Sequence, residues 1–343
     1  MKILITAANG RTGFPAAKEL LLLGFNVRAF VRNANNVKAL ELKKKGAEIF
    51  VGDMHDMRDV RESLKGIDGA FFVPTPPNLL FQGATFATAV DEMKLKHVVV
   101  LTQWLSSNTH PSFYTKEHWL IDQTFKRLQN TNITILNPGL FAYPYFMMPE
   151  PMLQFGVMAD LGTNAPPSNE DIGLVAAHIL KKPEAHINKT YRVTSKELLS
   201  PQEMAAIIGK VVGRKIKVKR FAEGMTLKMF KTYGFTQKDA SQVIHYSKDA
   251  RDGIFAINAP TSVVKDIVGK EADDFETIAK RYLHGHPMLK QSFVNKLKTM
   301  GIMMKAMTTS KWDMKKYEKE QGMPNFKNML SPKDSNEWKK DYE

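Results

Sequence analysis

The sequence contains no cysteine among its 343 residues. Disulfide bonds, thiolate nucleophiles and zinc sites built on sulfur are therefore excluded, and the composition suits a reducing compartment. No stretch reaches the ~18 consecutive apolar residues of a membrane-spanning helix. A signal-peptide pattern is also missing, because Met1 leads directly into a short apolar run. We therefore expect a cytoplasmic protein with no membrane span.

Acidic residues are the scarcer charged type, since 35 Asp and Glu stand against 49 Lys and Arg, which gives a net charge of +14. Such an excess can indicate nucleic-acid binding, but that function needs basic residues gathered into a patterned motif. Here they are spread along the chain, and no zinc finger or aromatic RNA-binding signature accompanies them. We expect no nucleic-acid partner and no metal. A basic solvated surface, or attraction of an anionic ligand such as a phosphorylated cofactor, explains the excess.

What the chain does contain is organised around residues 1–20. The run Ile3–Ile5 predicts a short buried strand, and apolar side chains at helical spacing follow from Phe14. A strand, a small-residue turn and a helix in this order are typical of a dinucleotide site, because the helix N-terminus offers free N–H donors to a pyrophosphate. A tight turn without ligand is the alternative. The turn comprises Ala7, Ala8, Asn9, Gly10, Arg11, Thr12 and Gly13.

Alternating strand and helix patterns continue after this turn. They predict a doubly wound parallel sheet of the α/β class, whose ligands bind at the carboxyl ends of the strands. We expect a cofactor-binding domain over residues 1–140 and a smaller, mainly helical substrate lobe over 141–284. A segment near 190, with a strand at 191–193, is expected to return to the sheet. The further strands are predicted near residues 25–32, 47–51, 69–73, 97–101 and 133–136.

Residues 285–343 form a C-terminal extension that is rich in Met and Lys. Within this helical tail, residues 293–304 could form a basic amphipathic helix able to touch membranes or partners. Such tails more commonly pack on their own domain or on a second subunit. A homo-oligomer or a protein partner bound through the extension therefore stays open.

The end of the second strand bears on cofactor choice. An NAD site wants an acidic residue there to hold the ribose 2′-hydroxyl, whereas the sequence offers Arg32 and no carboxylate beside it. Arg11 points toward the same part of a nucleotide. Two guanidinium groups suit a 2′-phosphate, so NADP(H) is preferred over NAD(H). Alternatively, Arg32 is a solvated residue at a strand end.

The later strand ends supply the remaining candidates. Asp53 could accept a hydrogen bond from the adenine amino group while Met54 packs on the ring, or it could cap the following turn. Lys116, early in a helix, could hold ribose hydroxyls and act as a catalytic proton relay, or it could be an ordinary helix lysine. The residues expected beside a nicotinamide are Pro74, Thr75 and Thr102, with Gln103 and Trp104 next to them.

An aromatic, proline-broken segment at 141–148 begins the second lobe. It could be the wall of a pocket or simply the core of that lobe. As a pocket wall, it would hold a small-molecule substrate together with an aromatic residue of the fifth strand end. The residues chosen for this wall are Trp104, Phe141, Tyr143 and Phe146.

Together these motifs resemble atypical short-chain dehydrogenases/reductases of the NmrA-like kind. The resemblance is firmest over residues 1–142 and implies a Rossmann domain with a small substrate lobe and NADP(H) lying across the strand ends. The motifs that carry it are T-A-A-N-G-R-T-G at 6–13, Arg32, G-D-M-H-D at 52–56, V-V-V-L-T at 98–102, Lys116 and I-T-I-L-N-P-G-L-F at 133–141.

The sequence departs from the family pattern in ways that bear on chemistry. Ala7 and Asn9 replace the usual glycine and threonine of the turn, and Asn137 replaces an arginine. Ser112 stands where ordinary short-chain dehydrogenases carry the tyrosine of Tyr-x-x-x-Lys. Alcohol dehydrogenation needs that acid, and within the family its loss accompanies reductases of quinones or enones and NADP(H) sensors.

We therefore predict an NADPH-dependent reductase that transfers hydride to a small electrophile of quinone or enone type. Lys116 is its expected catalytic residue. The alternative is a non-catalytic NADP(H)-binding redox sensor that acts through a protein partner.

Overall fold

The computed structural model describes residues 1–323 and 329–342. Seven parallel strands form the main sheet in the order β3-β2-β1-β4-β5-β6-β8. This order, with crossovers on both sides of β1, confirms the predicted doubly wound sheet. The strands are β1 (Lys2–Ile5), β2 (Asn26–Val31), β3 (Glu48–Val51), β4 (Gly69–Phe72), β5 (His97–Leu101), β6 (Asn132–Leu136) and β8 (Lys189–Tyr191).

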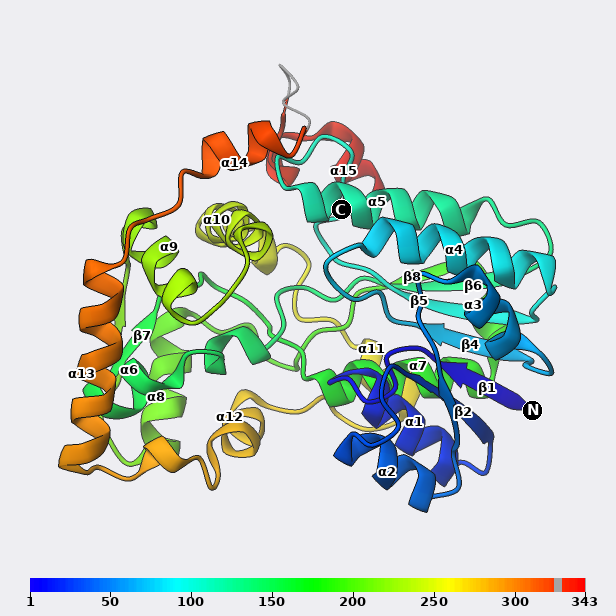
Figure 1. Cartoon of the computed structure of the whole chain (residues 1–343), viewed down its shortest axis with the longest axis horizontal. Coiled ribbons are helices and arrows are strands. Elements are labelled where there is room, and N and C mark those ends of the chain that lie inside the picture. Colours follow the sequence, from blue (N-terminus) through cyan, green and yellow to red (C-terminus); the bar gives the residue numbers. More distant parts are fainter. Residues whose placement is uncertain (324–328, 343) are drawn as a thin grey trace.

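Helices cover both faces of this sheet (Figure 1). Because neighbouring side chains of a strand point to opposite faces, Ile3 and Ile5 join one core while Leu4 joins the other. Double coverage explains why β1, β4 and β5 read as apolar runs without alternation. One face holds α1 (Gly13–Leu22), α2 (Val37–Lys44) and α7 (Asn169–Lys181), and the other holds α3 (Met57–Leu64), α4 (Leu79–Glu92) and α5 (Phe113–Lys126).

Helix α7 packs tightly against α1, and a glycine makes that approach possible. A Cβ atom added to Gly173 would lie 2.8 Å from the backbone nitrogen of Ala16 and 2.9 Å from the carbonyl oxygen of Thr12. Only glycine leaves room for the two backbones at this distance. Residues 169–191 therefore belong in space with the first unit of the chain.

The last strand of the sheet differs from its prediction. Strand β8 pairs with β6 over Lys189–Tyr191, two residues earlier than the predicted 191–193. Directly after the strand, the Arg192 guanidinium donates hydrogen bonds to the backbone oxygens of Phe255 and Ile257, which joins the end of β8 to residues 255–257.

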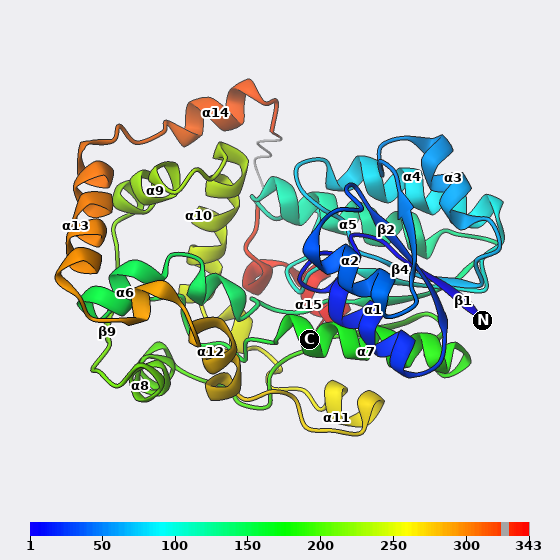
Figure 2. The same cartoon turned by 60° about the horizontal axis from the view of Figure 1, so that its bottom comes forward.

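The second lobe is mainly helical, with a short parallel pair of strands that the sequence pattern did not reveal. Helix α8 begins with a capping box, in which Ser200 and Glu203 exchange hydrogen bonds with each other's backbone. Helix α11 differs from its neighbours because it packs back against α7, as Figure 2 shows. The elements are α6 (Pro149–Phe155), β7 (Val157–Ala159), α8 (Pro201–Val212), β9 (Lys217–Lys219), α9 (Glu223–Thr232), α10 (Gln237–Arg251), α11 (Val263–Val268) and α12 (Phe275–Leu283).

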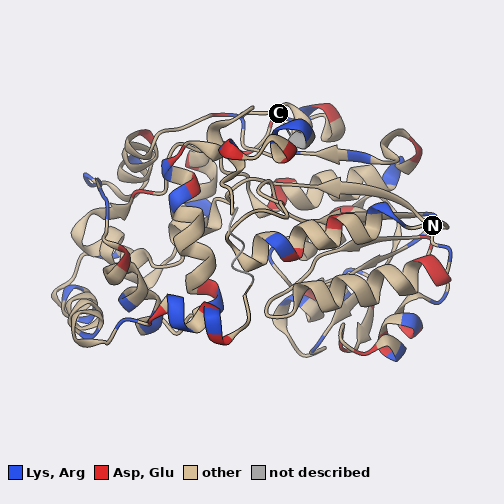
Figure 3. Ribbon diagram, turned by 90° about the horizontal axis from the view of Figure 1, so that it is seen from above, with Lys and Arg blue, Asp and Glu red and all other residues tan. Residues whose placement is uncertain are grey.

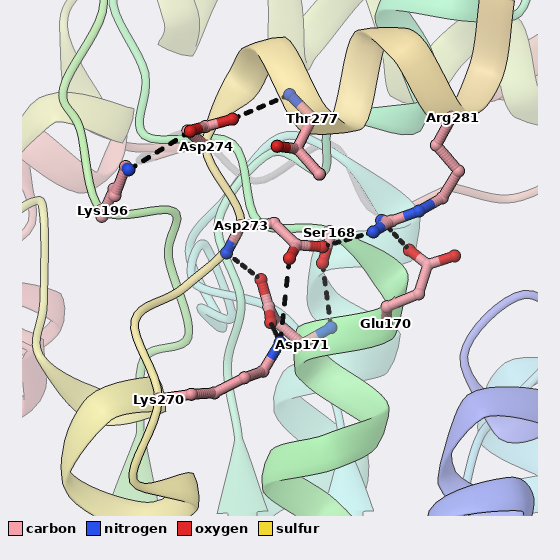
Figure 4. A network of polar contacts seen from close by, with 9 residues as sticks. All are labelled: Ser168, Glu170, Asp171, Lys196, Lys270, Asp273, Asp274, Thr277 and Arg281. Carbon is pink, nitrogen blue, oxygen red and sulfur yellow. Dashed lines mark hydrogen bonds and ion pairs between the residues drawn. The ribbon is translucent and has the colours of Figure 1, made fainter. Parts of the chain in front are cut away.

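A polar network joins the start of α7 to the segment before α12 (Figure 4). The carboxylate of Asp171 is fully buried, accepts a hydrogen bond from the backbone N–H of Asp273 at 2.8 Å and pairs with Lys270 at 3.2 Å. Beside it, Arg281 bridges Glu170 and Asp273. A buried carboxylate without such partners would be strongly destabilising, so this network fixes the second lobe against the sheet domain.

The C-terminal extension runs around the outside of the second lobe and returns to the sheet domain. Helix α13 (Phe293–Thr308) lies at the outer edge, α14 (Met314–Glu320) passes near α10, and α15 (Asn336–Tyr342) ends close to α5 (Figure 1). None of the helices in the described part of the chain is long and apolar enough to cross a membrane. Lys and Arg occur on both halves of the molecule and are interspersed with Asp and Glu (Figure 3).

Candidate functional site

The turn after β1 has the close backbone approach that a pyrophosphate requires. Ala7 adopts a positive φ of 45°, a conformation that favours glycine. The N–H of Gly10 donates to the carbonyl oxygen of Ala7 at 2.7 Å, and a Cβ atom at Gly10 or Gly13 would lie 2.9 or 2.5 Å from that same oxygen. The turn is therefore built for glycine at positions 10 and 13. Helix α1 starts at Gly13 with its N-terminus at this edge of the sheet.

Two side chains of the turn contact later parts of the chain, one on α7 and one in the second lobe. Thr12 donates a hydrogen bond to the side-chain oxygen of Asn169 at 2.9 Å. The Arg11 guanidinium stacks on the ring of Tyr143, with its central carbon 3.6 Å from the ring centroid, and also donates to the Tyr143 hydroxyl. The turn residue Asn9 and the buried Ala8 lie between β1 and these contacts. Arg11 is thus held in place by an aromatic ring from the other lobe.

Three cations lie in the turn after β1 and in the segment after β2, namely Arg11, Arg32 and Lys38. Arg32 is exposed directly after the strand, and Lys38 lies in the first turn of α2. Burial and then the charge of Arg11 lower the pKa of Lys38, so Lys38 and Arg11 are close enough to repel each other. An anion would relieve this repulsion. Lys38 was not selected from the sequence. Its place a few residues after the end of the second strand was the signal that could have identified it as a cofactor-binding candidate.

The loops after β3 and β4 are tied together by hydrogen bonds. The Asp53 carboxylate accepts from the backbone N–H of His55 at 2.9 Å and from its ring nitrogen Nδ1 at 2.7 Å. These bonds, with a smaller contribution from Arg32, lower the pKa of Asp53. Asp53 therefore caps the turn that follows β3, which is the second of the two roles considered for it above. Its side chain is also largely exposed, and Met54 packs on the neighbouring core.

Gln82 of α4 holds the segment after β4. Its side-chain oxygen accepts from the N–H and the hydroxyl of Thr75, while its side-chain nitrogen donates to the Thr75 carbonyl at 2.8 Å. The same nitrogen lies 3.3 Å from Nε2 of His55. Pro74 precedes this clamp. The loop that would line one side of a cofactor is thereby fixed before any ligand arrives.

A buried network fixes the end of β5. Thr102 accepts a hydrogen bond from the side-chain nitrogen of Asn137 at 3.0 Å and donates to Asp122 of α5. Ser106 donates to the same carboxylate at 2.6 Å. Burial raises the pKa of Asp122 to about 6. Asn137, which replaces the family's arginine, thus holds the Thr102 hydroxyl in place.

Lys116 lies in the first turn of α5, and its side chain is nearly buried. Burial lowers its pKa, and its Nζ lies 3.9 Å from the sulfur of Met329 in the C-terminal extension. Ser112 caps the helix by accepting from the N–H of Thr115, and its hydroxyl donates to Gln242 of α10. The hydroxyl at the position where ordinary short-chain dehydrogenases carry tyrosine is therefore engaged in holding α5 and α10 together.

The neighbouring polar groups also join α5 to α10. His110 and Asp249 form a fully buried pair with a distance of 2.9 Å, and the other ring nitrogen of His110 accepts from the N–H of Ser112. Burial lowers the pKa of His110. Tyr114 is buried under Lys238, whose ammonium lies 4.6 Å from the ring centroid. Its hydroxyl therefore does not replace the missing tyrosine of the helix start.

The four aromatic residues expected to line a substrate wall fall into different environments. Tyr143 stacks on Arg11, whereas Phe146 is buried against Phe275 and Tyr282 in the core of the second lobe. Phe141 packs on the core shared by α1 and α7. Trp104 is buried between the Arg192 guanidinium, 3.8 Å from its ring, and Trp338 of the extension. Tyr143 and Trp104 thus remain at the strand ends.

Trp338, like Lys38, was not selected from the sequence. It is 2% exposed and packs with Trp104, Leu105, Ile254 and Phe255. A lone tryptophan among charged residues near the end of the tail was the only available signal. Within residues 1–323 and 329–342, no group of three or more His, Cys, Asp or Glu side chains is placed to hold a metal ion.

The chain matches a family model and is similar to several reductases. The model of the NmrA-like family matches residues 1–257. An NAD(P)H azoreductase of Xenophilus azovorans is 25% identical over 292 residues, which is 82% of this chain and 97% of the azoreductase. A (4-alkanoyl-5-oxo-2,5-dihydrofuran-3-yl)methyl phosphate reductase of Streptomyces griseus is 23% identical and covers 80% of this chain and 95% of its own length.

Solved structures show the same fold. An NADPH-dependent quinone oxidoreductase of Escherichia coli, solved with NADPH, superposes with a TM-score of 0.71 at 18% identity and covers 81% of this chain and 99% of its own. A triphenylmethane reductase of Citrobacter sp., solved with NADP(H), has a TM-score of 0.69 at 20% identity and covers 82% and 100%. The C-terminal extension lies beyond the end of the family model.

Proposed function

This chain belongs to the NmrA-like family, and we propose on that premise that it is an NADPH-dependent reductase. Its substrate is a small, flat electrophile of the quinone or enone class. The observation that carries the proposal is the alignment of groups along the carboxyl edge of the sheet. A glycine-dependent turn opens α1, three cations lie in the turn after β1 and in the segment after β2, and a nearly buried lysine lies at the start of α5.

Each part of this edge suits one part of NADPH. The backbone N–H groups of Arg11, Thr12 and Gly13 suit the pyrophosphate, since that of Gly10 is engaged with the Ala7 oxygen. Arg11, Arg32 and Lys38 suit the 2′-phosphate. Thr102 and Lys116 suit the nicotinamide ribose. We therefore propose a preference for NADP(H) over NAD(H). When bound, the reduced nicotinamide supplies the hydride.

The chain's own contribution is positioning and proton supply. Burial lowers the pKa of Lys116, which makes its Nζ a better proton donor than an exposed lysine. Ser112 offers no comparable acid, because its hydroxyl is engaged with Gln242. A substrate whose reduced form delocalises negative charge needs less acid assistance than a simple ketone. Quinones and enones meet this condition, which supports them as the substrate class.

The names of relatives support the same assignment. The azoreductase, the quinone oxidoreductase and the triphenylmethane reductase are all reductases, and all three are named or solved with NAD(P)H or NADP(H). Their identity to this chain is at most 25%. The quinone or enone class thus rests on the site geometry, with these names as support.

NADPH oxidation measured against a panel of quinones and enones tests the proposal. Lys116→Met should lower kcat/KM by at least about tenfold, in the range of a positioned acid–base group. Lys126→Met, an exposed lysine at the other end of α5, is the matched control and should leave turnover unchanged. Equal turnover in wild type and Lys116→Met would remove the assigned role of Lys116.

The second candidate function is a non-catalytic NADP(H) sensor. It is favoured by the burial of Trp104 under Trp338, which covers an aromatic surface expected to meet substrate. Tight NADPH binding without turnover on any member of the panel would support the sensor. So would binding of a partner protein that changes with the ratio of NADP⁺ to NADPH.

A further inference from the structure

Helix α13 presents apolar side chains to solvent along its whole length. Phe293, Met304 and Met307 are 76%, 64% and 63% exposed, and Leu297 and Met300 are each 48% exposed. Their spacing of four, three, four and three residues places them on one side of the helix. We call these five residues the outer stripe of α13.

The opposite side of α13 is the side that packs on the second lobe. Thr299 and Ala306 are fully buried, and at 100° per residue both lie on the far side of the helix from the outer stripe. Lys228 of α9 donates to the carbonyl oxygen of Met307 at 2.9 Å. Helix α13 therefore packs on the second lobe through its inner side, and the outer stripe faces away from that lobe.

The charged residues of α13 and of the chain on either side of it are all positive. Residues 277–312 contain no Asp or Glu, and they carry six lysines and one arginine. Within the helix, Lys296 lies about 60° from the centre of the outer stripe, and Lys298 and Lys305 lie about 120–140° from it on the other side. Large apolar side chains bordered by lysine on the polar side are the pattern of a helix that lies in the surface of a membrane.

We propose that α13 docks on an anionic lipid surface, with the outer stripe among the acyl chains and the flanking lysines at the headgroups. Methionine and leucine side chains are flexible and apolar, which suits a fluid surface. The place of α13 in the fold agrees with such docking. It lies at the outer edge of the second lobe, at the end of the molecule opposite the sheet (Figures 1 and 2). A membrane bound there leaves the strand ends open.

A second copy of the chain fits this surface less well. If two α13 helices paired through their outer stripes, Lys296 and Lys298 of one would approach lysines of the other, because the helix has no acidic residue to pair with them. The 16-residue helix is ~24 Å long, and a stable protein interface needs about 800 Å² on each partner. Anionic headgroups complement the lysines, whereas a second copy repels them.

Vesicle flotation with the full chain tests the proposal. The probes are vesicles of phosphatidylcholine alone and vesicles of phosphatidylcholine with phosphatidylglycerol. We expect binding to the anionic vesicles that weakens as salt is raised, and at least tenfold weaker binding to the neutral ones. Leu297→Gln/Met304→Gln should reduce binding to anionic vesicles at least tenfold. Lys298→Gln/Lys305→Gln should abolish the preference for anionic vesicles.

The matched control is Leu22→Gln/Val37→Gln, which replaces two residues that are 80% and 79% exposed on the sheet domain. It should bind vesicles like wild type. No binding of wild type, or binding that Leu297→Gln/Met304→Gln leaves unchanged, would overturn the proposal. So would a dimer in sedimentation velocity that the same double variant dissociates, because a second copy would then cover the outer stripe. Thermal unfolding of each variant shows that it is folded.

Discussion

The indole N–H of Trp338 donates to the backbone oxygen of Trp104 at 3.2 Å, although 234 positions separate the two residues. Their rings meet edge to face with centroids 5.2 Å apart, a favoured geometry for aromatic pairs. Leu330 and Lys333 make further contacts, to the Thr109 carbonyl and to Asp252. The end of the extension is therefore an integral part of the core at the fifth strand end.

Replacing Trp338 should destabilise the whole protein. Trp338→Ala should lower the free energy of unfolding by about 3–5 kcal/mol, as for other large buried aromatics. Trp338→Phe keeps most of the packing and loses the hydrogen bond, so it should cost less, about 1–2 kcal/mol. Denaturant unfolding measures both. Lys340→Ala, an exposed position on the same helix α15, is the control. A Trp338→Ala protein as stable as this control would show that α15 does not contribute to the core.

The cations at the end of β2 should determine the cofactor preference. Arg32→Ala and Lys38→Met should each weaken NADPH binding about 10- to 100-fold, because a hydrogen bond to a charged group contributes ~1.5–3 kcal/mol. NADH binding should change little, since NADH lacks the 2′-phosphate. Calorimetric titration measures both affinities. Lys44→Met at the far end of α2 serves as the control. Equal losses for NADH and NADPH would contradict the 2′-phosphate assignment.

The turn should not tolerate a methyl group at position 13. Gly13→Ala places a Cβ atom 2.5 Å from the Ala7 oxygen and 3.1 Å from the Ala8 Cα atom, so the backbone must shift. We expect a loss of about 1–3 kcal/mol in stability and weaker NADPH binding. Gly301 lies in α13, and a Cβ atom added there would have no neighbouring atom within 4 Å. Gly301→Ala should therefore be neutral or stabilising by up to about 1 kcal/mol. Unchanged NADPH affinity in Gly13→Ala would count against the turn as the pyrophosphate site.

Asp122 should make stability depend on pH. Its pKa is about 6 in the folded protein, against an ordinary value of 3.8. The folded state therefore binds more protons between these values, and this contribution to stability is lost as pH rises through about 6. The difference between these two pKa values corresponds to about 3 kcal/mol in the free energy of unfolding.

Asp122→Asn removes the titration and keeps an oxygen that can accept from Ser106. Relative to wild type, the variant should therefore gain up to about 3 kcal/mol between pH 4 and pH 7.5. Denaturant unfolding at both pH values measures this change. Identical pH dependence in the two proteins would show that folding does not raise the pKa of Asp122.

The sheet could be predicted from sequence because its signals are local. Each strand is a short apolar run, each helix has its own periodicity, and the opening turn needs glycine at positions 10 and 13 for reasons that lie within seven residues. The role of Asp53 as a turn cap also depends on local contacts, because its hydrogen bonds are to His55, two residues away. The capping box that starts α8 is equally local, because it is formed by Ser200 and Glu203.

The remainder of the site depends on contacts between distant segments. Tyr143 reaches Arg11 across 132 positions, and no periodicity in either segment specifies that pairing. Lys38 and Trp338 acquire their roles only when α2 and α15 are placed in the fold. The strands β7 and β9 are three residues each, which is too short for a pattern of alternation. The sequence could not distinguish the buried Phe146 from the more accessible Tyr143 for the same reason.

The burial of Trp338 against Trp104 also has a consequence for synthesis of the protein. A ribosome that adds about 5–20 residues per second needs roughly 10–50 s to proceed from one tryptophan to the other. During that interval the nascent chain can form the sheet, and it can add α7 once residue 181 has been made. The part of the Trp104 surface that Trp338 covers stays exposed until the tail arrives. The waiting chain is therefore a natural client for chaperones that shield exposed hydrophobic surface.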